Sequence, residues 1–151
     1  MGTFVSENVP VVTLKTMLEN YWESFSETTT PSFVIVNDPE GEFMRVDYST
    51  GDYVLISMDG TESVKYRGNI SYYDRSFPIT IQIGTKEGRQ RLRDIWKMIK
   101  SILFDRKHEF DNWQLIRILS YTEMVSNDQN IWRAVIRIQL ESAGVSVETT
   151  A

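Results

Sequence analysis

Apolar residues between positions 13 and 25 recur every three or four residues, which is the spacing of one face of an α-helix. The set consists of Leu14, Met17, Leu18, Tyr21, Trp22 and Phe25. Thr13 is a suitable N-cap and Pro10 lies just outside the segment, so the pattern predicts a helix over 13–25. We expect its aromatic side chains to pack in the core.

After Pro31 the period becomes that of β-strands. Runs rich in β-branched and aromatic residues predict strands over 33–36, 43–48 and 53–58, separated by turn-forming segments at 37–41 and 49–52. Residues 64–73 predict a polar, aromatic strand or long loop interrupted by Gly68 and Asn69. Residues 78–83 alternate strictly, which predicts a strand with its three isoleucines on one face.

A second helix is predicted over 85–104, with Thr85 as its N-cap and Glu87 in its first turn. Its apolar face carries Leu92, Ile95, Trp96, Ile99, Ile102 and Leu103. The other face carries Arg89, Arg93, Lys97 and Lys100. We interpret this basic face as solvated or paired with acids of the first half of the chain, and contact with phosphate groups is the alternative.

Residues 113–121 and 131–140 predict two long strands joined by a polar turn, which is the pattern of an antiparallel hairpin. In the second strand, alternate residues from Trp132 to Leu140 face the core, whereas Arg133 and Arg137 lie on a half-polar face open to solvent or a partner. Together the elements predict an α+β fold: a mostly antiparallel sheet with a long amphipathic helix on one face and an N-terminal helix.

The composition agrees with one compact domain over 1–151. The 151 residues are 41% hydrophobic and 25% charged, and they contain no apolar stretch of about 18–20 residues. We therefore expect a protein that is soluble when made, has no membrane partner, and carries flexible arms at 1–12 and 144–151.

The chain has no cysteine and one histidine, His108. This excludes thiol catalysis, disulfides, iron–sulfur clusters and Cys-containing or His-rich metal centres. The signature sequences of P-loop, dinucleotide-binding, serine-hydrolase and zinc-protease sites are also absent. His108 follows the second predicted helix, where the helix dipole favours a cation, so we interpret it as a capping residue.

Two groups of charged residues remain as candidate metal sites. One is Asp59, Glu62 and Lys65, and the other is Asp38, Glu40 and Glu42. The first loosely resembles a nuclease site, but its spacing points the acid and the lysine to different faces of a strand. The acids of the second group occupy alternate positions in the sequence, and their carboxylates could bind a hard cation. We interpret both as solvated loops and expect no catalytic residue, cofactor or metal ion.

Charge is distributed unevenly along the chain. Residues 1–64 contain eleven acids and two bases, a net charge of −9, whereas residues 65–151 have a net charge of +4. We expect the acids around Asp38, Glu40 and Glu42 to face bases of a neighbouring copy or to line a channel.

Aromatic and basic residues are interleaved in one segment of the second half. They are Tyr66, Arg67, Tyr72, Tyr73 and Arg75. Tyr and Arg are enriched at protein interfaces, so we favour a protein interface here over a platform for single-stranded nucleic acid.

Four segments of the second half carry a family resemblance. They are the strand YYDRSFPITIQI (72–83), the helix RQRLRDIWKMI (89–99), the turn DNWQL (111–115) and the closing strand 131–140. In order and composition they resemble the tail terminator (tail completion) and related minor tail proteins of tailed viruses, over residues 65–142.

The resemblance implies a structural virion protein of the tail or neck, assembled in the host cytoplasm and without an active site. Such a protein forms a hexameric ring that caps the tail tube and joins it to the head connector. The implied partners are other copies, the tail tube protein and head–tail connector proteins, with genome DNA passing through the lumen without specific binding. The alternatives are a small metal-dependent nuclease or nucleic-acid-modifying enzyme, and another connector or adaptor protein.

Overall fold

The computed structural model describes residues 9–25, 29–37, 39–58, 63–67, 72–110, 113–126 and 130–146. The helices are α1 (Val9–Phe25), α2 (Pro39–Arg45) and α3 (Arg89–Asp105), with short 3₁₀ turns η1 (Tyr48–Thr50) and η2 (Lys107–Glu109). The strands are β1 (Ser32–Ile35), β2 (Tyr53–Met58), β3 (Ser63–Arg67), β4 (Tyr72–Thr85), β5 (Leu115–Ser126) and β6 (Ile131–Ser146). They form one six-stranded sheet of order β1-β2-β4-β6-β5, with β3 paired to β4. Among the described strands, β1 and β2 pair in parallel and all other pairs are antiparallel, so the predicted α+β fold with a mostly antiparallel sheet is confirmed.

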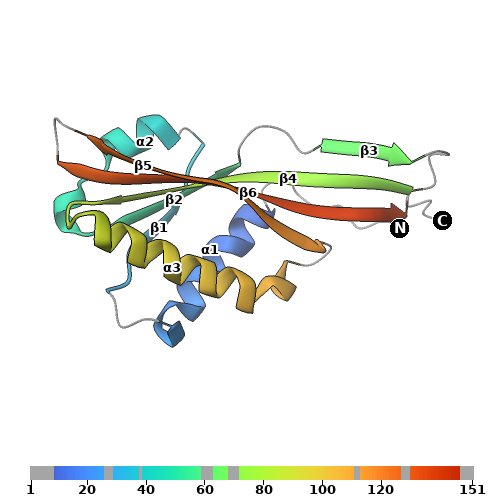
Figure 1. Ribbon diagram of the computed structural model, residues 1–151, viewed down its shortest axis with the longest axis horizontal. Coiled ribbons are helices and arrows are strands. Elements are labelled where there is room, and N and C mark those ends of the chain that lie inside the picture. The colour runs from blue at the N-terminus through green and yellow to red at the C-terminus, as the bar shows by residue number, and fades with distance from the viewer. Residues whose placement is uncertain are drawn as a thin grey trace.

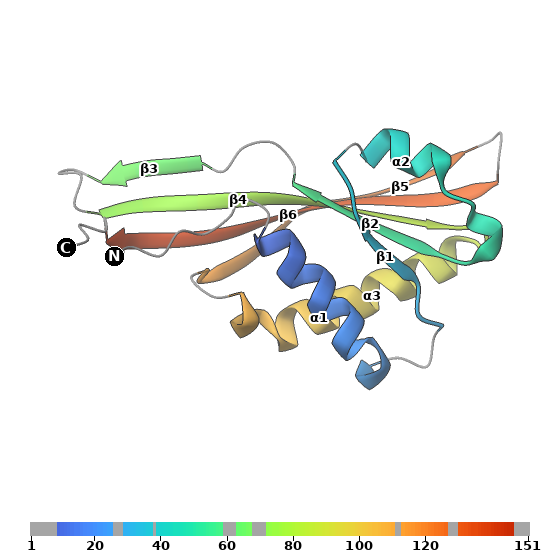
Figure 2. The same cartoon turned by 180° about the vertical axis from the view of Figure 1, so that it is seen from behind.

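The two faces of the sheet are covered differently. Helices α1 and α3 lie on one face and α2 lies on the other (Figures 1 and 2). The strand period of two sends alternate residues to each face. The face toward α1 and α3 buries Phe77, Ile79, Ile81 and Ile83 of β4 and Ala134, Ile136, Ile138 and Leu140 of β6. A smaller core with Phe43, Tyr48, Leu55 and Ile131 fills the space under α2.

The long strands β4 and β6 continue past the helices and form a projection with β3 (Figure 1). We call this projection the arm and define it as residues 63–67, 72–76 and 141–146. Within the arm, β4 pairs with β3 on one side and with β6 on the other. Beyond the arm, β4 pairs with β2 from Ile79 onward. Strands β4 and β6 therefore belong to both the core and the arm.

Two predicted element starts are wrong. Helix α1 begins at Val9, so Pro10 lies inside its first turn, where a missing N–H is tolerated, and Thr13 is not the N-cap. Thr85 ends β4 instead of capping a helix, and its Oγ1 accepts a hydrogen bond from the Glu87 N–H at 3.1 Å. Helix α3 starts only at Arg89, so Glu87 is outside it.

The predicted strand over 43–48 is also wrong. Residues 39–45 form α2, because Pro39 suits a first helical turn, and Phe43 then points into the smaller core. The next turn is η1, whose N-cap Asp47 accepts hydrogen bonds from the Ser49 N–H and hydroxyl at 3.0 and 2.6 Å. These bonds lower the pKa of Asp47.

Gly84 is required where β4 passes the aromatic residues of the smaller core. A Cβ at this position would lie 2.2 Å from Cε1 of Tyr48, whose hydroxyl is itself fixed by donating to the Phe43 carbonyl at 3.1 Å. We therefore expect Gly84→Ala to lower the free energy of unfolding by about 1–3 kcal/mol, as overpacking does. Urea denaturation measures this loss, and Gly84→Ala should cost much less when it is introduced into a Tyr48→Leu variant, in which the clashing ring is absent. Equal stability of Gly84→Ala and wild type would contradict the close packing.

Candidate interaction surface

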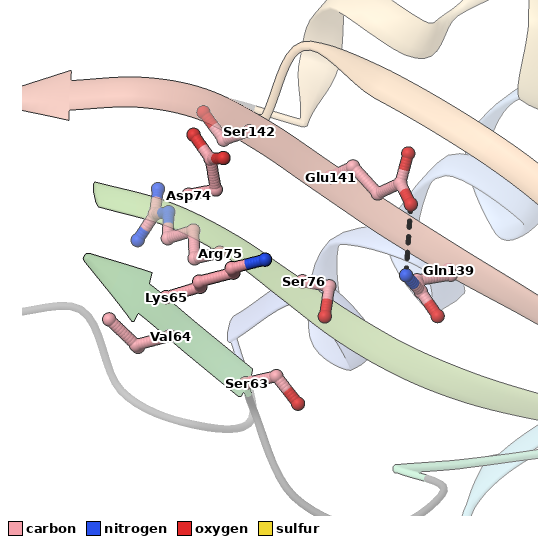
Figure 3. A pocket seen from close by; sticks show the side chains of 9 residues that line it. All are labelled: Ser63, Val64, Lys65, Asp74, Arg75, Ser76, Gln139, Glu141 and Ser142. Carbon is pink, nitrogen blue, oxygen red and sulfur yellow. Dashed lines mark hydrogen bonds between the residues drawn. The ribbon is translucent and has the colours of Figure 1, made fainter. Parts of the chain in front are cut away.

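The arm carries a hollow on the side of the sheet away from α1 and α3. Its volume is about 410 Å³, and its lining comes from all three arm strands (Figure 3). The lining residues are Ser63, Val64, Lys65, Asp74, Arg75, Ser76, Gln139, Glu141 and Ser142. The hollow therefore depends on the pairing of β3, β4 and β6.

Apart from Val64, the side chains that line the hollow are polar, and they include charges of both signs. Lys65 lies opposite Asp74 in the β3–β4 register. The carboxylate of Glu141 accepts a hydrogen bond from Gln139 Nε2 at 2.9 Å and pairs with Arg117 Nη2 at 3.1 Å. Among the described residues, no group of three or more His, Cys, Asp or Glu is placed to hold a metal ion. This chemistry suits contact with polar groups of another protein.

The structure brings the predicted tyrosine-rich interface residues together on the arm. In the β3–β4 register, Tyr66 lies opposite Tyr73 and Arg67 opposite Tyr72. The segment predicted as a strand or long loop is thus two strands of an antiparallel pair. The predicted metal-site acids Asp59 and Glu62 lie outside the described residues.

Three predicted interface arginines are placed differently from one another. The Arg75 guanidinium stacks on the Trp113 ring, 4.2 Å from its centroid. That of Arg133 lies 4.4 Å from the centroid of Phe43 and donates through Nη2 to Gln82 Oε1 at 2.8 Å. Arg137 is exposed and lies opposite Thr80, outside the arm. Arg75 and Arg133 therefore make packing contacts within the chain.

The predicted acidic interface lies in the body of the molecule, away from the arm. Glu40 and Glu42 belong to α2, and Glu42 pairs with Arg45 at 3.1 Å. Asp38 lies outside the described residues. His108 is exposed in η2, directly after the end of α3.

The chain ends predicted to be flexible, 1–12 and 144–151, are each partly regular structure where they join the rest of the chain. Residues 9–12 are helical and Val11 is buried, while β6 runs to Ser146. The remaining residues of both segments lie outside the described residues.

The structure also contains a mostly buried ion pair between Arg91 and Asp52. Arg91 Nε lies 2.7 Å from Asp52 Oδ2, and the two side chains are only 12% and 8% exposed. Arg91 also donates through Nη2 to the Thr29 carbonyl at 2.6 Å. The pair links the start of α3 to the start of β2. No sequence pattern indicates it, because the partners are far apart in the chain.

The basic face of α3 is paired with a different acid from the one predicted. Arg89 and Arg93 both contact the carboxylate of Glu123 on β5, at 3.2 and 2.9 Å. Glu123 belongs to the second half of the chain. The prediction that these two arginines pair with acids of the first half is therefore wrong.

Comparison of the sequence with models of known protein families and with characterised proteins finds no match. In the described part of the chain, no helix combines the length and the apolar character needed to span a bilayer.

Proposed function

We propose that the protein is a structural subunit that assembles with copies of itself into a ring, of the kind that tail terminator proteins form at the end of a viral tail tube. The arm is the observation that carries this proposal. Its strands extend beyond the helices that cover the rest of the sheet (Figure 2). A projection of this kind adds exposed surface without enlarging the core, which favours a role in contact with other subunits.

The side chains of the arm agree with an assembly role. Val64 on β3 is 48% exposed, and the exposed backbone edge of a strand is a ready template for association. Lys65 and Asp74 place opposite charges on the same surface. In a ring each subunit uses two different patches, so the arm of one copy would contact the body of the next.

The first test measures assembly of the full chain. We expect wild type to form a ring, visible by negative-stain electron microscopy and by its mass in sedimentation velocity, alone or with the tail tube protein. Val64→Asp should abolish the ring while circular dichroism and thermal unfolding stay near wild type, because an exposed residue is changed. Val12→Asp is a matched control on α1, since Val12 is 50% exposed and lies outside the arm.

The second test measures function in a virus that lacks the gene. Complementation with wild type should restore tails of normal length and DNA-filled heads that join them, whereas Val64→Asp should not. A truncation after Ser146 keeps all of β6 and tests the segment 147–151 separately. Normal tails in the complete absence of the protein would contradict the tail function, and a wild-type chain that stays monomeric with and without the tube protein would contradict the ring.

A further inference from the structure

The exposed side of α3 carries a row of four cations, each about one helical turn from the next. We call Arg89, Arg93, Lys97 and Lys100 the α3 basic row. One carboxylate, that of Glu123, contacts the first two members. Lys97 is exposed, and no carboxylate among the described residues forms an ion pair with Lys97 or Lys100. The row therefore keeps an excess of positive charge after its internal pairing.

Aromatic rings and Glu123 hold three of the cations in place. The Arg89 guanidinium lies 5.2 Å from the Trp132 ring centroid, and the Lys100 ammonium lies 5.4 Å from that of Trp96. Arg93 donates to Glu123 at 2.9 Å, and this bond lowers the pKa of Glu123. Side chains that are already positioned lose less conformational entropy when they bind, which favours a role in recognition.

The opposite side of the molecule carries an acidic segment. Residues 38–47 include four acids and one base in sequence, and those described lie on or after α2. The side chain of Glu42 is 34% exposed, and Asp47 is exposed with a lowered pKa, so it is ionised at neutral pH. Figures 1 and 2 show α2 and α3 on opposite faces of the sheet. Two copies can therefore bring the two surfaces together, whereas one copy cannot.

We infer that the α3 basic row binds the acidic segment around α2 of a second copy of this chain. The contact joins two different patches, so it repeats from copy to copy and closes a ring or continues as a stack. This inference rests on the proposed function and names a pair of surfaces for it beyond the arm. A nucleic-acid backbone is the competing partner, and the net charge of −5 disfavours it.

Charge reversal tests the contact in the full chain. Lys97→Glu should weaken self-association by about tenfold or more, because it places like charges opposite each other, and the Lys97 ammonium has no ion-pair partner among the described residues to lose. Glu42→Lys should weaken it similarly, and the double variant should recover association to within about threefold of wild type. Lys107→Glu is the matched control, because Lys107 is exposed in η2 beyond the row. Sedimentation velocity at low and high salt measures self-association of these four variants and of wild type. Wild-type association is expected to weaken as the salt concentration rises.

Three outcomes would overturn the inference. A wild-type ring unaffected by Lys97→Glu and Glu42→Lys would show that these surfaces do not meet, while the arm-based ring would stand. Loss of binding to a fluorescent DNA duplex in Lys97→Glu, with assembly unchanged, would assign the row to phosphates instead. A chain that never associates would overturn this inference together with the proposed ring.

Discussion

Replacing Trp96 with alanine should lower the free energy of unfolding by about 3–5 kcal/mol, which is the range for truncating a large core aromatic residue. The Trp96 side chain lies in the main core and is 7% exposed. Its ring also stacks on Tyr121, with centroids 5.7 Å apart, so the substitution removes a contact between α3 and β5 as well as buried apolar area. Chemical denaturation monitored by far-ultraviolet circular dichroism gives the loss directly.

The neighbouring residue provides the control for this substitution. Lys97→Ala changes an exposed side chain on the same helix turn, so its effect should stay within about 0.5 kcal/mol. If Trp96→Ala cost less than roughly 1 kcal/mol, the face of α3 described as buried could not be packed against the sheet.

Removal of the Asp52 carboxylate should destabilise the fold by about 3 kcal/mol or more, because it leaves the Arg91 guanidinium charged in a mostly buried position. The two side chains are 12% and 8% exposed and 2.7 Å apart. Arg91 keeps its contact with Glu87 at 3.3 Å, but Glu87 is 68% exposed and its ion pair is screened by water. Urea denaturation of Asp52→Ala at neutral pH measures the loss.

Two further variants separate charge from packing at this pair. Glu87→Ala should cost less than about 1 kcal/mol, because it removes only the exposed partner. Replacing both Arg91 and Asp52 with leucine should lower the free energy of unfolding less than Asp52→Ala alone, because the double variant buries no unpaired charge. If Asp52→Ala were as stable as wild type, water would have to solvate the Arg91 guanidinium as well as the Asp52 carboxylate does.

The sheet and the long helix could be predicted because their residues follow a strict period. Alternating isoleucines identify the central part of β4, and the apolar spacing from Leu92 to Leu103 identifies α3. The error at 43–48 has a physical cause: a seven-residue helix holds too few turns for a period of 3.6 to be recognised, and aromatic content favoured a strand.

The candidate surface could be predicted only in part. Tyr66, Arg67, Tyr72 and Tyr73 are close in sequence, so their grouping on the arm follows from local pairing of β3 and β4. The contacts of Arg75 with Trp113 and of Arg133 with Phe43 join distant segments, and no local pattern predicts them. The extension of β4 and β6 into an arm also depends on pairing between distant strands.

The sharing of β4 and β6 between the core and the arm has a mechanical consequence. Because β4 and β6 run from the core into the arm, the projection cannot pivot without breaking hydrogen bonds of the ladder that joins them. Pro78 lies between the last β4 residue paired with β3 and the first one paired with β2, and no described strand residue pairs with it on that side, so its ring stiffens the junction without removing a described ladder hydrogen bond there. In the proposed ring, an arm held in this way would meet the next subunit with its orientation already set, so docking would require little rearrangement, and a tilt of the arm tip would be transmitted through β4 and β6 to the core.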